Sequence, residues 1–268
     1  MSKDRLISQS ILKRMKDYIN NEECGLKIKA QYVDGVVFPP SEAQLLGQWF
    51  EYICTGAMPP YDSERVPEAK KLKNGNLAKS YERMEYQVAN FKNLLKHYNI
   101  EIVSIGEEIQ YGNARGTTDI IAIVDGQKAI IDLKASGLIR DKWNPLGWED
   151  IANPYKPKMK VLTQAIHYKY IAKNAWQCDD VPFYFWIFST TNEKDNRIIK
   201  VEIDEDEYAL HERELADAKV YLEKQLENGF KAKPSMLRCR NCPLAHSCEH
   251  KTEFAEVEVV HYSSELTL

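Results

Sequence analysis

The 268-residue sequence predicts an α/β fold in which a mixed central β-sheet is flanked by helices. Three observations support this prediction. Apolar residues recur at helical spacing in several segments, and short runs rich in β-branched residues alternate with those segments. An Asp-Gly pair joins two of the β-branched runs and indicates a hairpin. Strands interspersed with helices favour a sheet covered by helices over an all-α or an all-β domain.

The N-terminal part of the chain is predicted to be mostly helical. Residues 8–20 form a short helix, which is followed by a loop that carries Cys24. Ser41 is predicted to be the N-cap of a second helix, because apolar residues at helical spacing begin just after it. The prolines and polar residues of 59–76 predict a surface connection. Residues 80–99 are predicted to form a third helix with one apolar face.

A β-hairpin is predicted next. Two β-branched runs, 119–124 and 128–134, flank the pair Asp125-Gly126. Asp-Gly between two such runs is the strongest short-range signal for a two-residue hairpin turn. The two strands are therefore expected to pair in antiparallel fashion, with the turn at the far end from residue 119.

The remaining elements complete the predicted sheet and its helical cover. In chain order they are a strand at 100–111, a turn at 112–118, a loop at 137–157, a helix at 160–174, strands at 183–191 and 197–203, a charged helix at 204–228 that ends before Gly229, and a final strand at 253–262. The loop contains tryptophans and prolines and follows the hairpin directly, so it is a candidate flap over a substrate.

The hairpin carries two acidic residues and a lysine in an arrangement that predicts a metal site. Asp119 begins the first strand and Asp132 lies near the end of the second, so the two come close in space. Strand alternation puts Lys134 on the same face as Asp132, and Leu133 on the other face. Converging carboxylates within apolar runs are costly unless a cation holds them. Mg²⁺ or Mn²⁺ beside an ammonium group suits the hydrolysis of a phosphodiester.

These residues resemble the catalytic pattern of the PD-(D/E)XK nuclease superfamily, in which an Asp precedes an Asp-x-Lys motif. Gln164 and Tyr168 resemble the Gln-x-x-x-Tyr motif of its RecB-type branch. The resemblance implies a restriction-endonuclease-like core, in which Asp119 and Asp132 bind Mg²⁺ or Mn²⁺ and Lys134 orients the attacking hydroxide. Gln164 and Tyr168, four residues apart on one helix face, would contact DNA or brace the catalytic groups.

Further metal ligands are implied by the same resemblance. The backbone carbonyl of Leu133 is one of them. Glu51 is another, because it stands four residues after Gly47, where the RecB-type branch often has a metal-binding histidine. A carboxylate is an equally suitable ligand for Mg²⁺. The alternative for Glu51 is an exposed helical residue. Glu107 and Glu108, on the strand before the hairpin, are weaker candidates.

Three cysteines near the C-terminus predict a second metal site. Cys239, Cys242 and Cys248 have the spacing of a knuckle for a soft or borderline metal, and they need a fourth ligand. The layout is similar to the iron–sulfur members of the RecB-type branch, which include AddB-type nuclease domains and exonucleases of CRISPR adaptation. By that resemblance, Cys24 completes a structural [4Fe–4S] cluster. The alternative is a structural Zn²⁺ held by the three cysteines and one of two histidines, His246 or His250.

The resemblance also implies how the chain is organised. A single nuclease domain is expected over residues 1–268, with segments 20–30 and 235–250 contributing the cysteine lobe. The chain has six cysteines and no secretory apolar segment, which argues for thiols or metal ligands over disulfides. Cys54 and Cys178 are predicted to be core residues. The expected location is the bacterial cytoplasm, for a bacterial protein or a phage protein in its host.

Charge distribution predicts where nucleic acid binds. The net charge is −4, but residues 128–173 carry nine basic and four acidic side chains, a local excess of five positive charges. DNA, single-stranded or at duplex ends, is the expected partner, and a second copy of the chain or a recombination protein is a further candidate. No window of about 18 uncharged apolar residues occurs, so no membrane span is expected.

The function expected from these features is that of a divalent-metal-dependent deoxyribonuclease. It would be an exonuclease on single-stranded or end-processed DNA, in recombination, repair or phage DNA processing. One alternative is a non-catalytic DNA-binding or scaffolding protein on the same fold, which the glutamate at position 51 keeps open. Another is a nuclease that acts on RNA or flap structures, because catalytic acids of this kind contact phosphate rather than sugar.

Overall fold

The computed structural model of the chain describes residues 6–20, 22–59, 65–144, 146–153 and 161–253. Two compact units make up the chain. The first comprises Met1–Leu12 and Pro39–Lys219, and the second comprises Lys13–Phe38 and Val220–Leu268. Helices α1 (Gln9–Ile19) and α6 (Glu205–Asn228) each begin in one unit and end in the other. The predicted helices at 8–20 and 204–228 are thereby confirmed.

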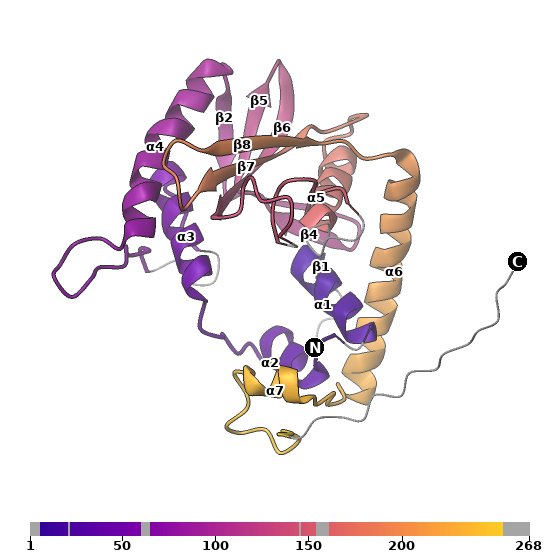
Figure 1. The fold of residues 1–268 in the computed structure, drawn as a ribbon. Coiled ribbons are helices and arrows are strands. Elements are labelled where there is room, and N and C mark those ends of the chain that lie inside the picture. Colours follow the sequence, from indigo (N-terminus) through magenta and orange to yellow (C-terminus); the bar gives the residue numbers. More distant parts are fainter. Residues whose placement is uncertain (1–5, 21, 60–64, 145, 154–160, 254–268) are drawn as a thin grey trace, which may run out of the picture. The chain divides into compact units, whose positions relative to one another are not determined.

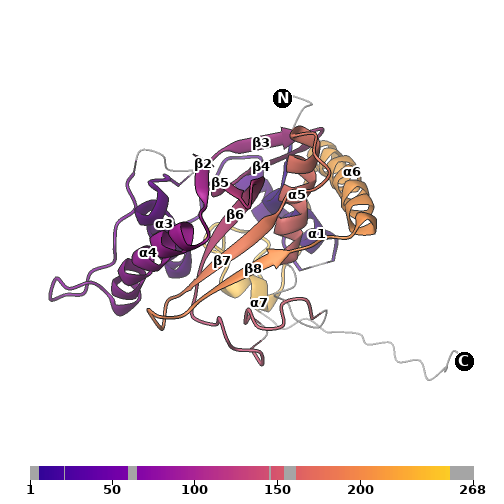
Figure 2. The same ribbon diagram turned by 90° about the horizontal axis from the view of Figure 1, so that it is seen from above.

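A five-stranded mixed sheet forms the centre of the first unit, with the strand order β2-β5-β6-β7-β8. The strands are β2 (Glu101–Ile105), β5 (Ile120–Val124), β6 (Gln127–Ser136), β7 (Phe183–Ser189) and β8 (Asn196–Val201). β6 and β7 run parallel, whereas the other neighbours are antiparallel. Figure 2 shows β6, β7 and β8 side by side between the helices. The predicted mixed α/β fold is confirmed.

The predicted hairpin is confirmed as the antiparallel pair β5–β6. Val124 pairs with Gln127 across a two-residue turn. Asp125 and Gly126 occupy this turn with φ angles of 49° and 78°. Two consecutive residues in the left-handed region are the requirement of a type I′ turn, which Asp and Gly meet more easily than other residues.

The single strand predicted at 100–111 and the turn predicted at 112–118 are wrong. The first part of that segment is β2 of the five-stranded sheet, and the rest belongs to a second, three-stranded sheet. Its order is β1 (Ile7–Ser8), β4 (Ala114–Thr117) and β3 (Glu108–Tyr111). Gly106 ends β2 with a φ of 64°, and its N–H donates to the carbonyl of Asp119 at 3.1 Å. This left-handed residue redirects the chain, so β2 and β3 join different sheets.

Helices cover both faces of the five-stranded sheet, as Figure 1 shows: α3 (Glu42–Thr55) and α4 (Lys79–His97) on one side, α5 (Leu162–Ala175) on the other. Ser41 is the N-cap of α3, as predicted, and forms a capping box with Gln44. The α3–α4 side buries the main core. Its members are Leu46, Trp49, Phe50, Tyr81, Met84, Phe91, Ile120, Ala122, Val124, Ala129, Ile131, Leu133, Trp186 and Phe188.

The second unit contains two short helices that were not predicted, α2 (Gly25–Tyr32) and α7 (Met236–Arg240). Cys24 lies in the connection that follows α1, as predicted, and is the N-cap residue of α2. The ring of Tyr18, which is buried, lies 6.1 Å from that of Tyr221 and 6.5 Å from that of Phe230. The strand predicted at 253–262 lies outside the described residues from 254 onward.

None of the helices in the described part of the chain combines the length and the apolar composition that crossing a bilayer requires.

Candidate active site

Asp119 and Asp132 lie opposite each other at the open end of the β5–β6 hairpin. Ile120 pairs with Ile131, so the residue before β5 faces the residue after Ile131 on β6. The Asp119 Oδ2 atom accepts a hydrogen bond of 2.8 Å from the backbone N–H of Leu133. Asp132 is only 2% exposed. The hairpin therefore brings the two carboxylates together, as its turn and register predict.

Lys134 shares the sheet face of Asp132. Its ammonium forms an ion pair with Asp132 Oδ2 and lies 5.9 Å from the centre of the Phe185 ring. Leu133, between them, points into the core on the other face. The predicted alternation along β6 is thus confirmed.

Negative charge accumulates at this point. Burial raises the pKa of Asp119 well above its ordinary value, and the charges of Asp132 and Glu51 raise it further. Burial also raises the pKa of Asp132, although the Lys134 ammonium opposes this effect. Burial by itself would lower the pKa of Lys134, but the surrounding carboxylates together raise it. Three carboxylates share one ammonium, which leaves an excess of negative charge in a poorly solvated place.

Glu51 is the third carboxylate of this group. It lies on α3 and is half-buried. Burial raises its pKa, Asp132 raises it further, and Lys134 lowers it. The charges of Asp132 and Lys134 both act on the Glu51 carboxylate. Glu51 is therefore not the exposed helical residue of the alternative interpretation.

Gln164 and Tyr168 lie on α5 and make different contacts. Gln164 Nε2 donates to Asp132 Oδ1 at 2.6 Å. Tyr168 donates its hydroxyl to the carbonyl of Thr117 at 2.6 Å, and its ring stacks on Phe183 at an angle of 12°. Burial raises the pKa of Tyr168, and the nearby carboxylates add to this effect. Gln164 therefore holds the Asp132 carboxylate, whereas Tyr168 fixes α5 to the small sheet.

The sequence patterns did not indicate how closely β4 approaches Tyr168. A Cβ atom placed on Gly116 would lie 2.4 Å from the Cε1 atom of Tyr168. Any side chain at this position would displace the tyrosine ring from Thr117. Gly116 lies three residues before Asp119, and only the spatial neighbour explains why glycine is needed there.

Three other residues were predicted to be metal ligands: Leu133 through its carbonyl, and Glu107 and Glu108 as weaker candidates. The structure gives Leu133 a contact through its N–H, and the role of its carbonyl stays a prediction. Glu107 is exposed, and its backbone carbonyl accepts from Thr118. Glu108 is exposed as well and pairs with Arg115 at 3.6 Å. Neither glutamate is among the charges that act on Asp119 or Asp132.

Hard divalent cations suit this donor set because they prefer carboxylate oxygens and would offset the excess negative charge. In the structure, the oxygens of Asp132 contact Gln164 and Lys134, and Asp119 Oδ2 contacts the Leu133 amide. Across the described residues, no three or more His, Cys, Asp or Glu side chains are gathered closely enough to hold a metal ion. The charge and the chemistry of the site fit the cation, and its ligation stays a prediction.

The raised pKa of Asp119 predicts an effect on stability. The folded chain favours the protonated carboxyl more than the unfolded chain does. Stability is therefore highest below the ordinary pKa of an aspartate and falls as the pH rises through the raised pKa. In EDTA at pH 7, Asp119→Asn should therefore increase the free energy of unfolding, because the amide carries no charge that burial would penalise. Urea unfolding between pH 3 and pH 8 measures this.

The gain of Asp119→Asn should vanish near pH 3, where both states of the wild-type carboxyl are protonated. Added Mg²⁺ should stabilise the wild type and leave the variant unchanged. A variant that is less stable than the wild type at pH 7 in EDTA would contradict the assigned direction of the pKa.

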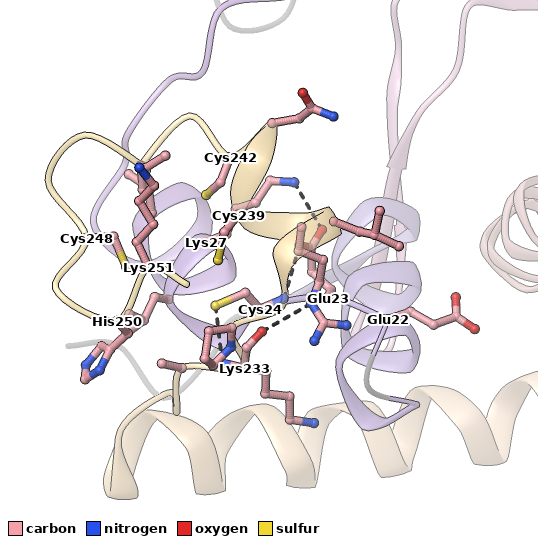
Figure 3. Close-up of a pocket in the computed structure, with 18 residues that line it drawn as sticks. Glu22, Glu23, Cys24, Lys27, Lys233, Cys239, Cys242, Cys248, His250 and Lys251 are labelled. Carbon is pink, nitrogen blue, oxygen red and sulfur yellow. Dashed lines mark hydrogen bonds and ion pairs between the residues drawn. The ribbon is translucent and has the colours of Figure 1, made fainter. Parts of the chain in front are cut away.

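The second unit contains a cavity of about 250 Å³ that all four predicted cysteine ligands line. They are Cys24, Cys239, Cys242 and Cys248, and Figure 3 shows their sulfur atoms turned toward the space between the two segments that carry them. His250 lines the same cavity, but its ring points away from the sulfurs. His246 is not among the residues that line this cavity.

Basic groups lie near these cysteines, as do two glutamates, Glu22 and Glu23. Lys27, Lys233 and Lys251 line the cavity, together with Arg238. The backbone N–H of Lys233 donates to Cys24 Sγ at 3.4 Å. Cationic neighbours and an N–H···S bond both stabilise sulfur ligands that carry negative charge. The donor set therefore fits a thiolate-bound metal centre chemically.

The two other cysteines differ from each other. Cys54 packs against the main core from α3, and burial raises its pKa to about 12. Cys178 is half-buried in the turn after α5, where its thiol contacts the carbonyl of Lys173 at 3.9 Å. The core prediction is thus confirmed for Cys54 and wrong for Cys178.

No protein-family model and no curated protein matches the chain. Among solved structures, it is similar to that of a proposed exonuclease from Eubacterium rectale, with a TM-score of 0.60 and 18% identity over 94% of this chain and 92% of the other. The likeness to an alkaline exonuclease from Laribacter hongkongensis is weaker, with a TM-score of 0.40 and 11% identity over 84% and 92%. For a phage-related exonuclease from Haemophilus somnus, the values are 0.39 and 12% over 83% and 96%. The first similarity shows that the two chains share a fold over nearly their whole length.

Proposed function

We propose that the chain is a divalent-metal-dependent deoxyribonuclease. The observation that carries this proposal is the pair of carboxylates, Asp119 and Asp132, joined to Lys134 at the open end of one hairpin. The fold shared with the proposed exonuclease from Eubacterium rectale supports it. A structural ion pair alone does not account for three carboxylates around one ammonium, because the surplus charges destabilise one another.

Each residue has a distinct task in this proposal. Asp119, Asp132 and Glu51 would hold a Mg²⁺ or Mn²⁺ ion, which supplies a Lewis acid and an attacking water. Lys134 keeps its positive charge, because its pKa is raised, and it can stabilise the negative charge that develops on the phosphoryl oxygens.

Gln164 acts as a positioning residue. Its amide holds Asp132 Oδ1, so the second carboxylate oxygen stays directed at Lys134. The bond of Tyr168 to Thr117 fixes the same helix to β4. Helix α5 therefore sets the orientation of the carboxylate.

The test of the proposed function is a cleavage assay with the full chain. End-labelled and internally labelled linear DNA, single-stranded and double-stranded, is incubated with Mg²⁺, with Mn²⁺ or with EDTA. Circular single-stranded DNA and RNA of the same sequence serve as comparisons. An exonuclease releases mononucleotides or short products from linear DNA in the presence of the cation and leaves the circle intact.

Each result bears on a stated alternative. Cleavage of circular DNA would indicate an endonuclease, and equal cleavage of RNA would remove the restriction to DNA. Tight DNA binding without cleavage under any cation would support a non-catalytic binding protein and refute the enzymatic proposal.

For the second unit, we propose a structural metal centre held by Cys24, Cys239, Cys242 and Cys248. A [4Fe–4S] cluster is preferred, because four cysteines line one cavity while the His250 ring points away from their sulfurs. Zn²⁺ held by three cysteines and a histidine is the alternative. Such a centre would link segments more than two hundred residues apart in the sequence.

Anaerobic purification followed by metal analysis and absorption spectroscopy tests this centre. We expect about four iron atoms per chain and a broad visible band toward the blue. Cys242→Ser should lose the band and the iron, whereas Cys178→Ser, outside the cavity, should keep both. A colourless protein with one zinc per chain would favour the alternative, and a protein without bound metal would refute both.

A further inference from the structure

The loop after β6 contains one buried tryptophan and one that is largely exposed to solvent. It is described over residues 137–144 and 146–153. Trp148 is 1% exposed, whereas Trp143, five residues earlier, is 85% exposed. Tryptophan is enriched at binding interfaces, because its ring offers a large apolar face together with a polar N–H group.

Several contacts hold this loop beside the catalytic face of the sheet. The Trp148 ring lies 5.4 Å from the ring of Phe185, which is the ring that the Lys134 ammonium approaches. The backbone N–H of Trp148 donates to the Leu138 carbonyl at 3.0 Å, which joins the two ends of the loop. Trp148 therefore connects the loop to the site through one shared aromatic neighbour.

Two ion pairs connect the loop to β8 and to the turn that precedes β8. Arg140 donates from Nε and Nη2 to Asp195 Oδ1 at 3.2 and 3.1 Å. Arg197 pairs with Glu149. The loop thus has anchors on both sides of Trp143.

The tip of the loop has a defined conformation that presents Trp143 outward. Asp141 Oδ1 accepts from the backbone N–H groups of Trp143 and Asn144, at 3.0 and 2.9 Å. The Lys142 ammonium lies 4.8 Å from the centre of the Trp143 ring. Exposing so large an apolar surface costs hydration free energy, which a bound partner would recover.

We propose that Trp143 and Lys142 form a contact for single-stranded nucleic acid, in which a base stacks on the indole and a phosphate meets the ammonium. This inference rests on the proposed nuclease function and specifies how the strand approaches the site. Base stacking on aromatic side chains beside basic groups is the usual way that proteins hold single strands without sequence preference.

Charge favours a nucleic acid over an apolar protein partner at this tip. The described basic residues around it are engaged, because Lys134 pairs with Asp132, Arg140 with Asp195 and Arg197 with Glu149. Lys142 is exposed, and its ammonium lies over the Trp143 ring. An ammonium next to an exposed indole complements a phosphate next to a base.

Fluorescence anisotropy with a labelled twenty-nucleotide oligothymidylate in EDTA tests the inference without cleavage. Trp143→Ala should weaken binding about tenfold, whereas Trp143→Phe should keep most of the affinity. An abasic oligonucleotide of the same length should bind the wild type and Trp143→Ala with equal affinity, because it has no base to stack. Oligothymidylate should also quench the tryptophan fluorescence of the wild type more than that of Trp143→Phe.

Tyr86→Ala is the matched control, since Tyr86 is another exposed aromatic residue, on α4. It should bind oligothymidylate like the wild type. The inference is overturned if Trp143→Ala keeps wild-type affinity, or if it loses affinity for the abasic strand to the same extent. It is also overturned if the wild type does not bind single strands.

These outcomes are distinct from those of the nuclease proposal. Stacking on Trp143 without any metal-dependent cleavage would uphold the binding site and refute the nuclease. Cleavage with full activity and unchanged KM in Trp143→Ala would uphold the nuclease and refute the stacking contact.

Discussion

Asp132→Asn is expected to reduce DNA cleavage by about a thousandfold or more, while the protein stays folded and still binds DNA. The substitution keeps the size of the side chain and an oxygen that can accept from Gln164. It removes the negative charge that pairs with Lys134 and that the proposed divalent cation would need, and it turns an amide N–H₂ toward the Lys134 ammonium. Initial rates of cleavage in Mg²⁺ and in Mn²⁺ measure the effect.

Asp125→Asn provides a matched control on the same hairpin. Asp125 lies in the turn with a φ of 49°, a conformation that asparagine adopts readily. The charge change is the same, but it occurs at the opposite end of the strands from the carboxylate group. We expect wild-type cleavage from this variant. Equal activities of Asp132→Asn and the wild type would remove Asp132 from the catalytic site.

The hairpin could be predicted from the sequence because its determinants are local. A type I′ turn needs two residues with positive φ, and Asp125-Gly126 supplies them between two β-branched runs. The two-residue period of a strand then places Asp132 and Lys134 on one face without any knowledge of the rest of the fold. The central part of the candidate site therefore follows from about sixteen consecutive residues of the sequence.

The small sheet could not be predicted in this way. Residues 100–111 resemble one continuous strand, but Gly106 has a φ of 64°, and the strands on its two sides belong to different sheets. β1 is two residues long and pairs with β4, more than a hundred positions away. Pairings of this kind depend on the folded surroundings and leave little trace in a short segment.

Motif resemblance located Gln164 and Tyr168, but it did not distinguish their contacts. Both lie on one face of α5, yet Gln164 reaches Asp132 while Tyr168 reaches Thr117. The difference follows from β4, which approaches the helix at Gly116. Because that strand was predicted to be a turn, its contact with the tyrosine had no basis in the sequence.

The second large effect is expected from Trp148. Trp148→Ala should reduce the free energy of unfolding by about 3–5 kcal/mol, because it removes a buried indole next to Phe185 and leaves a cavity. Chemical denaturation of the purified variant measures the loss. The same substitution at Trp143, in the same loop, should change stability by less than about 0.5 kcal/mol, because that ring is 85% exposed.

The pair of variants separates anchoring from binding within one loop. Trp148→Ala should release the base of the loop and let the tip move relative to Phe185 and Lys134, so it should lower both stability and affinity for single strands. Trp143→Ala should lower affinity alone. If Trp148→Ala were as stable as the wild type, Trp148 would not anchor the loop on the sheet. The proposed binding role of Trp143 depends on that anchor, so this result would count against it as well.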